Sequence, residues 1–281
     1  MSPASETGFS SRALSPALGA EILGIDLRSR FSDEVYRAIV ECWHRSQVIL
    51  LRGQDLSEDD QIVFAERFGT GALSPGHIAG LQKRAGLSLI TNVREDGKLI
   101  GILPDGEMQF HSDQCYKERP SKGTMLYAID IPASGGNTLF ANMYRAYETL
   151  PQDVKTRLAG AKAMNVYDYN ANPTSRGAAG SGAPSYAHPM VRTHPDTGRK
   201  ALYVNRLMTT HVLGTAQDES QALLDMLFDH LEKREFVYEH VWHKGDVLIW
   251  DNRCVVHART DFDPAERRLL RRATFKGEAV A

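Results

Sequence analysis

Residues 106–116 have the sequence GEMQFHSDQCY, and the triplet His111-Ser112-Asp113 inside this segment is the first candidate for a functional site. Side chains two positions apart in an extended segment point to the same face, so His111 and Asp113 can both reach one metal ion. The alternative is a surface histidine beside an aspartate in a loop, because a chain with ten histidines produces this pattern easily by chance. Other parts of the sequence must decide between a ligand pair and a coincidence.

The composition is that of an ordinary soluble protein, with 42% hydrophobic and 24% charged residues in 281 positions. The formal net charge of −2 gives no electrostatic case for binding nucleic acid. No apolar run approaches bilayer length, and the first residues lack the basic and apolar regions of a signal peptide. The three cysteines are widely separated and show no disulfide pattern. We therefore expect a cytoplasmic protein with no membrane or nucleic-acid partner.

Short apolar segments bounded by turn residues predict many strands and few helices. Strands are expected at residues 20–27, 48–51, 87–92, 124–129, 138–140, 190–193, 201–204, 236–242, 247–250 and 267–275. Helices are expected after the capping residues Ser32 and Ser57, and at residues 143–150, 152–158 and 218–232. Because no repeat or linker divides the chain, we predict one mainly β domain over residues 1–281. It has peripheral helices around a barrel or jelly roll, and residues 1–12 are expected to be disordered.

Residues 170–186 show the weakest signal for regular structure. They contain glycine at positions 177, 180 and 182 and proline at positions 173 and 184. A long loop of this composition is either functional or disordered. We expect a lid over the site, with a tolerated insertion as the alternative.

A third candidate ligand, His257, follows a turn near the end of the chain. Two histidines and one carboxylate form the facial triad that leaves positions on a ferrous ion open for a co-substrate and oxygen. A zinc hydrolase could use similar ligands, but the His-Glu-x-x-His motif that supplies its general base is absent from the sequence. The zinc deaminase signature is absent as well.

Four motifs in the right order resemble the taurine dioxygenase/2,4-D dioxygenase (TauD/TfdA) family of Fe(II)- and 2-oxoglutarate-dependent oxygenases. They are Phe110-His111-Ser112-Asp113, Gly135-Gly136-Asn137-Thr138-Leu139, Trp250-Asp251-Asn252-Arg253 with His257, and Arg267-Arg268 through Arg272-Ala273-Thr274. The resemblance runs from about Ala20 to the end of the chain. It implies a double-stranded β-helix core, which is a cupin-like jelly roll and agrees with the many short strands.

The resemblance also implies a role for each matched position. His111, Asp113 and His257 would ligate Fe(II). Thr138 and Arg268 would hold the distal carboxylate of the co-substrate 2-oxoglutarate, since a guanidinium fork and a hydroxyl both donate to a carboxylate. Trp250 would pack near the iron and the co-substrate, although an ordinary core aromatic is the alternative.

The implied reaction uses O2, converts 2-oxoglutarate to succinate and CO2, and hydroxylates an unactivated C–H bond of a small organic molecule. Arg272 matches the position that grips the acidic group of the substrate, so an anionic substrate is expected. Arg268 and Arg272 are an even number of residues apart and share one strand face. Arg267 and Arg271 then point away from the site and are expected at the solvated surface.

The chain departs from the taurine enzyme at positions expected to contact the substrate. Ser74 and Glu107 stand where that enzyme has a His and an Asn on the sulfonate, and Met208 stands at its pocket aromatic. A carboxylate at Glu107 would repel a sulfonate, which makes taurine a poor candidate. Gln114 and His77 are further substrate-binding candidates. For all of these positions, a loop or packing role is the alternative.

Two other classes of function stay open at this point. One is a non-catalytic jelly-roll protein that binds a small acid, and the other is a metal-dependent hydrolase or isomerase on a cupin-like barrel. Neither would need the complete set of ligands together with Thr138 and Arg268. The resemblance also leaves a homodimer or homotetramer open.

Overall fold

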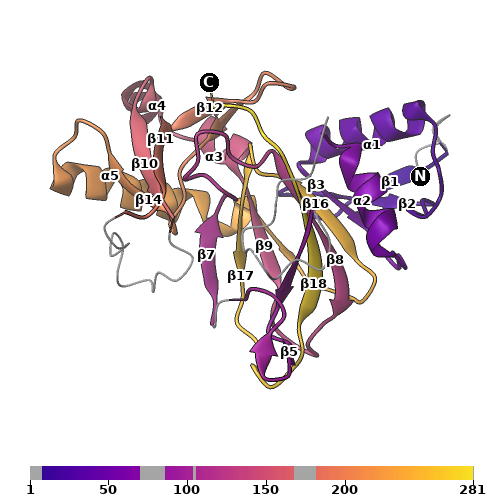
Figure 1. The fold of residues 1–281 in the computed structure, drawn as a ribbon. Helices are drawn as coiled ribbons and strands as arrows, with labels where there is room; N and C mark the ends of the chain where they lie inside the picture. The colour runs from indigo at the N-terminus through magenta and orange to yellow at the C-terminus, as the bar shows by residue number, and fades with distance from the viewer. Residues whose placement is uncertain (1–7, 70–85, 104–105, 168–181, 281) are drawn as a thin grey trace.

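The computed structural model describes residues 8–69, 86–103, 106–167 and 182–280, and two β-sheets form its centre (Figure 1). The larger sheet has seven strands in the order β1-β2-β3-β16-β8-β18-β4, and the smaller has four in the order β15-β9-β17-β7. The larger sheet contains β1 (Ser10–Ala13), β2 (Ala20–Leu23), β3 (Val48–Leu51), β16 (Val247–Asp251), β8 (Gly123–Asp130), β18 (Leu269–Phe275) and β4 (Leu87–Thr91). The smaller contains β15 (Val237–His240), β9 (Thr138–Asn142), β17 (Val255–Arg259) and β7 (Met108–His111).

The inner faces of the two sheets share one hydrophobic core. Phe140 of β9 packs on Trp250 of β16 with 5.4 Å between ring centroids, which joins the sheets directly. Leu126 of β8 and Leu248 of β16 belong to the same core. Two mainly antiparallel sheets that close on a common core form the jelly roll that the sequence predicted.

The outer face of the larger sheet is buried by two helices, α1 (Asp33–Ser46) and α2 (Glu58–Glu66) (Figure 1). Met125 and Ile249 point to this side, where they share a second core with Trp43 of α1 and Phe64 of α2. Because neighbouring strand residues point to opposite faces, β16 is buried on both faces and is apolar almost throughout. A register slip of one residue would exchange the two cores.

The predicted caps of both helices are confirmed. The Ser32 side chain accepts from the Val35 backbone N–H, and Ser57 forms a reciprocal capping box with Asp60. The other helices are α3 (Met143–Glu148), α4 (Gln152–Leu158), α5 (Gln217–Leu231) and a 3-10 turn at Arg234–Phe236. Among the described residues, no helix combines the length and apolar character needed to cross a membrane.

Three small sheets lie beside this core, and most of their strands were not predicted. β10 (Lys162–Val166) pairs with β11 (Ser185–Pro189) and β14 (Thr209–Val212). β12 (Val191–Thr193) pairs with β13 (Lys200–Leu202), and β5 (Arg94–Glu95) pairs with β6 (Lys98–Leu99). Most of the predicted 170–186 loop lies outside the described residues, so its role as a lid stays a prediction.

Several expected boundaries are wrong. Residues 10–12 are not disordered, because β1 pairs antiparallel with β2 from Ser10 to Ala13. Residues 20–27, predicted as a strand running into a turn, form β2 up to Leu23 and then bend and turn as expected, whereas the strand expected at 236–242 is the short β15 after a 3-10 turn. The organisation of residues 1–281 as one domain stays a prediction.

Arg271, on the far face of β18, was expected to be solvated, and this expectation is wrong. Its side chain is buried under α2, where Nε donates to Gln61 Oε1 at 2.6 Å and Nη2 donates to the Leu56 and Ser57 carbonyls. The far face of this sheet is a helix interface, so pointing away from the site does not mean pointing into water. Arg267 is exposed as expected and pairs with Asp130.

We expect Arg271→Ala to lower the free energy of unfolding by about 2–4 kcal/mol, because Gln61 and two carbonyls lose a buried charged donor. The matched variant Arg267→Ala removes an exposed ion pair and should cost less than about 1 kcal/mol. Urea unfolding of both variants measures the difference. Equal losses would show that the Arg271 contacts do not hold α2 on the sheet.

Candidate metal centre and co-substrate pocket

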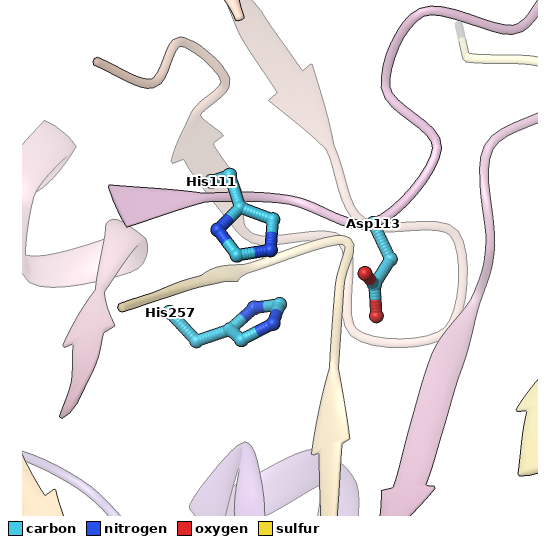
Figure 2. Close-up of side chains that lie close together, drawn as sticks. All are labelled: His111, Asp113 and His257. Carbon is cyan, nitrogen blue, oxygen red and sulfur yellow. The ribbon is translucent and has the colours of Figure 1, made fainter. Parts of the chain in front are cut away.

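Two histidines face each other across neighbouring strands of the smaller sheet. His111 of β7 and His257 of β17 are direct partners in the antiparallel register, with 4.1 Å between their ring centroids. Asp113 follows two residues after His111, and Figure 2 shows its carboxylate beside the two imidazoles. The ligand-capable atoms of the three side chains all lie within 4.8 Å of one another. The structure therefore brings together the three residues that the sequence singled out.

The backbone conformation that positions Asp113 differs from the one expected. β7 ends at His111, and Asp113 begins a turn in which Gln114 has a left-handed φ of 61°. The alternation of an extended strand therefore does not place the carboxylate. The turn after the strand does, and the sequence did not reveal it.

The electrostatics of the three residues suit metal binding. Burial, together with the neighbouring His111, lowers the pKa of His257 to about 3. Burial also lowers the pKa of His111. For Asp113, burial acts to raise the pKa, but His257 and Arg272 hold it well below its usual range. Two neutral imidazoles and one carboxylate are the forms that a metal ion requires.

The imidazole nitrogens also leave room for a metal ion. His111 Nδ1 lies 2.9 Å from the Gln109 carbonyl, so it carries the proton, and Nε2 is the nitrogen of this ring that could ligate a metal. His257 Nδ1 is buried and has no hydrogen-bond partner among the described residues. A borderline metal such as Fe(II) fits this donor set of nitrogen and oxygen.

Trp250 lies against the metal candidates as predicted. Its ring centroid is 4.6 Å from that of His257, and its side chain is almost fully buried. The indole N–H donates to Asn252 Oδ1 at 2.9 Å. Trp250 therefore packs on one ligand side chain and hydrogen-bonds away from it.

Arg268 is a buried cation that has no anionic partner in the described chain. It is 2% exposed, and its Nε and Nη2 donate to the Gly136 carbonyl at 3.3 and 3.2 Å. Nη1 has no partner among the described residues, and burial together with nearby Arg259 lowers the pKa of Arg268 to about 9. A guanidinium in this state would gain a charge-assisted hydrogen bond from a bound carboxylate.

Thr138 starts β9 two residues after Gly136 and is buried. Trp242 donates its indole N–H to Thr138 Oγ1 at 3.0 Å. An indole nitrogen only donates, so the Thr138 hydroxyl accepts here and keeps its own hydrogen for another partner. Nothing in the sequence indicated this contact with Trp242.

The Gly135-Gly136 pair gives the turn before β9 its close approach to Arg268. Gly136 has φ of 63°, and a Cβ there would lie 3.1 Å from Arg268 Nε. Gly135 has φ of 74°, and a Cβ there would lie 2.4 Å from the Asp261 carbonyl. The motif was visible in the sequence, but its contact with the arginine was not.

The structure places the substrate-binding candidates in different surroundings. Arg272 is half-buried, donates from Nε to Ser88 Oγ at 3.1 Å, and lowers the pKa of all three metal candidates, so its charge lies near them. Met208 is buried in an apolar cluster with Cys115, Tyr116 and Leu207, against which Met108 packs. Gln114 is buried and accepts from Lys117 Nζ at 3.2 Å. Glu107 is exposed beside β7, while Ser74 and His77 lie outside the described residues.

A second group of ligand-capable atoms, on His194, Asp251 and Cys254, is a hydrogen-bonded network. His194 Nε2 lies 2.9 Å from Asp251 Oδ2, and Arg253 donates to both oxygens of the same carboxylate. His194 Nδ1 accepts from two backbone N–H groups. Burial raises the pKa of the Cys254 thiol well above its usual value. These groups are satisfied, which explains Asp251 and Arg253 of the tryptophan motif as structural residues.

A jelly roll that presents two histidines and one carboxylate together fits the class of mononuclear iron oxygenases with a facial triad. The family model described as "Taurine catabolism dioxygenase TauD, TfdA family" matches residues 10–274, and the chain belongs to that family. The predicted family and the enzyme class, an oxidoreductase of the dioxygenase type, are confirmed.

Known proteins resemble the chain over nearly its whole length. It is 36% identical to "Alpha-ketoglutarate-dependent 2,4-dichlorophenoxyacetate dioxygenase" of Cupriavidus pinatubonensis (strain JMP 134 / LMG 1197), across 95% of this chain and 97% of that protein. The crystal structure of a taurine dioxygenase from Burkholderia xenovorans matches with a TM-score of 0.80 and 28% identity, covering 98% of this chain and 93% of that one. AAD-2 in complex with Mn(II) and N-oxalylglycine matches with a TM-score of 0.80 and 27% identity, covering 97% and 99%.

Proposed function

We propose that the protein hydroxylates an unactivated C–H bond of a small organic anion with an apolar body. It uses Fe(II), 2-oxoglutarate and O2 and releases succinate and CO2. The observation that carries this proposal is a buried set of two neutral imidazoles and one carboxylate, together with a buried arginine that has no anionic partner in the described chain. A hydrolase or isomerase would need the metal ligands but not the buried arginine.

His111, Asp113 and His257 are the proposed metal ligands. When bound, Fe(II) supplies oxygen activation and 2-oxoglutarate supplies two electrons through its oxidative decarboxylation. The chain holds the imidazoles neutral by burial and keeps the carboxylate ionised, so no proton has to be displaced before the metal binds at neutral pH.

Arg268 and Thr138 are the proposed donors to the distal carboxylate of 2-oxoglutarate. Gly136 accepts from one edge of the guanidinium and so orients Nη1 away from the turn. The Thr138 hydroxyl adds a second donor because its oxygen already accepts from Trp242. Trp250 closes the pocket on the side of His257.

Arg272 is the proposed contact for the acidic group of the substrate, since its charge lies near the ligands. The sulfur-rich cluster around Met208 and Cys115 offers an apolar wall. Taurine, which is polar at both ends, suits this wall poorly. The 2,4-dichlorophenoxyacetate named for one relative is an acid with an apolar body, and similar acids are the first candidates here.

Glu107, Gln114 and His77 stay candidates for substrate contacts. Because Glu107 is exposed beside β7, it would act on a part of the substrate that reaches out of the site. A cytoplasmic location and assembly into a homodimer or homotetramer also stay predictions.

We expect the protein with Fe(II), ascorbate and 2-oxoglutarate to form succinate faster when an accepted organic acid is present. His111→Ala should abolish this stimulation and the visible band that 2-oxoglutarate gives with Fe(II) in the absence of oxygen, because an imidazole ligand is lost. His211→Ala, at an exposed position on β14, should leave both unchanged. Full stimulated activity of His111→Ala would refute the proposed ligand set.

The Gly136 turn provides a test of the Arg268 pocket. Gly136→Ala and Gly53→Ala impose the same backbone strain, because φ is 63° and 62°, but only the first places a Cβ against Arg268. We expect only Gly136→Ala to raise the apparent Kd of 2-oxoglutarate, by about 10-fold, as expected for a weakened bond to a charged group. Anaerobic titration of the Fe(II) protein measures this. Equal Kd values for both variants would remove Arg268 from the co-substrate role.

Substrate charge is tested with an accepted acid and its neutral amide. Arg272→Gln should raise the KM for the acid by about 10- to 100-fold, because an anion loses its charged partner, while the KM for the amide changes little. Arg267→Gln, which alters an exposed residue, serves as the matched control. A preference for the acid that survives in Arg272→Gln would contradict the assignment.

A further inference from the structure

The carboxylate of Asp113 already has a hydrogen-bond donor on one of its two oxygens. Thr124 Oγ1 lies 2.5 Å from Asp113 Oδ2, and both residues are buried. Thr124 belongs to β8 of the larger sheet, so this contact joins the proposed ligand to the sheet opposite the two histidines. Thr124 is also a fully buried polar residue near the start of β8.

The direction of the hydrogen bonds around Thr124 follows from one group that can only donate. The Trp250 indole N–H donates to Asn252 Oδ1 at 2.9 Å, which fixes the orientation of the amide. Asn252 Nδ2 therefore faces Thr124 Oγ1 at 3.1 Å and donates to it. The Thr124 hydroxyl accepts from the amide, so its own hydrogen points to Asp113 Oδ2.

Asn252, which lies between Trp250 and Thr124 in this chain of hydrogen bonds, is held in place by further hydrogen bonds. The Asn252 backbone N–H donates to the Lys122 carbonyl at 3.0 Å, and the Asn252 carbonyl accepts from Ser112 Oγ at 2.9 Å. Asn252, Trp250 and Thr124 are each at most 1% exposed. Water therefore does not compete for these bonds, and buried groups in such a network depend on one another.

We propose that Thr124, oriented by Asn252 and Trp250, is a positioning residue that keeps Asp113 a one-oxygen ligand. The inference rests on the proposed ligand role of Asp113. Oδ2 takes the hydroxyl proton in a charge-assisted bond, so Oδ1 is left to face the metal. A carboxylate that bound through both oxygens would take a coordination position that the facial triad leaves open for co-substrates.

The test compares Thr124→Val with Thr124→Ser and with Thr274→Val. Valine keeps the shape of threonine without the hydroxyl, and serine keeps the hydroxyl. Thr274 is the cross-strand partner of Thr124 on β18 and is also buried, but among the described residues no hydrogen bond joins it to a proposed ligand. It therefore controls for placing a valine on this face of the sheet.

The first measurement is the Kd of Mn(II) for the metal-free protein. It is determined from the electron paramagnetic resonance signal of free Mn(II). Thr124→Val should raise the Kd about 10- to 100-fold, the usual effect of losing a partner of a ligating group. Thr124→Ser and Thr274→Val should stay within about threefold of the unmodified protein, since both keep the donor to Asp113. A Thr124→Val protein with unchanged Mn(II) affinity would overturn the proposal.

The second measurement is the visible spectrum of the Co(II)-loaded protein, which reports the coordination number and is insensitive to a general loss of stability. The spectrum should change in Thr124→Val, where Oδ2 is released, and not in Thr124→Ser. An unchanged Co(II) spectrum in Thr124→Val would overturn the one-oxygen role.

Two further arms keep the test decisive. If Thr124→Val does not fold, Thr124→Ala and Thr124→Ser both lack the methyl group and differ only in the hydroxyl, so the same difference in Kd is expected between them. If the unmodified protein itself binds no Mn(II), the ligand set of the proposed function fails and the role of Thr124 falls with it. If it binds Mn(II) and all Thr124 variants match it, only the role of Thr124 is wrong.

Discussion

The register between β7 and β17 is the constraint on which the rest of the site depends. It sets His257 directly opposite His111, and the pairing of β17 with β9 then sets Phe140 opposite His257. The same ladder places Thr138 opposite Arg259 at the other end of β9. The backbone register thus sets the positions of the two histidines and of Thr138, which we propose contacts the co-substrate. The larger sheet contributes the groups that surround them.

The buried arginines of the jelly roll are part of the reason for proposing an organic acid as substrate. Arg268 is buried just before β18, Arg272 of β18 lies near the metal candidates, and the ionised Asp113 is the carboxylate set among those candidates. A divalent metal ion would add further positive charge. Two carboxylate-bearing molecules, a co-substrate and a substrate, would offset it, since a buried charge without a partner is costly. This balance of charge is consistent with the anionic substrate that we propose.

Much of the site could be predicted from the sequence because its residues lie in short, ordered motifs. The structure brings together His111, Asp113 and His257, which the sequence singled out in this way, and the jelly roll followed from many short strands. The co-substrate role of Thr138 and Arg268, implied by the family resemblance, stays a prediction. The turn that carries Asp113 was missed because a left-handed Gln114 has no sequence signal comparable to a glycine. β10, β11 and β14 were missed because their strands are short and contain polar residues, so tertiary pairing decides their structure.

Side-chain partners across the fold were beyond the reach of the sequence. Trp242 is 104 residues from Thr138, and Thr124 is 128 residues from Asn252, so no local pattern relates them. The burial of Arg271 was mispredicted for a related reason. Strand alternation says which residues share a face, but it does not say whether the other face meets water or a helix.

Arg271 and Arg272 are adjacent in the chain and yet belong to separate parts of the molecule. One anchors a helix on the outer face of the sheet, and the other lies near the proposed ligands on the inner face. Neighbouring positions of β18 therefore serve different surroundings, one a helix interface and the other the metal candidates. Substitutions at alternate positions of the strand would alter the inner face, while the intervening positions would keep the helix in place. Libraries intended to redirect the enzyme would profit from the same spacing.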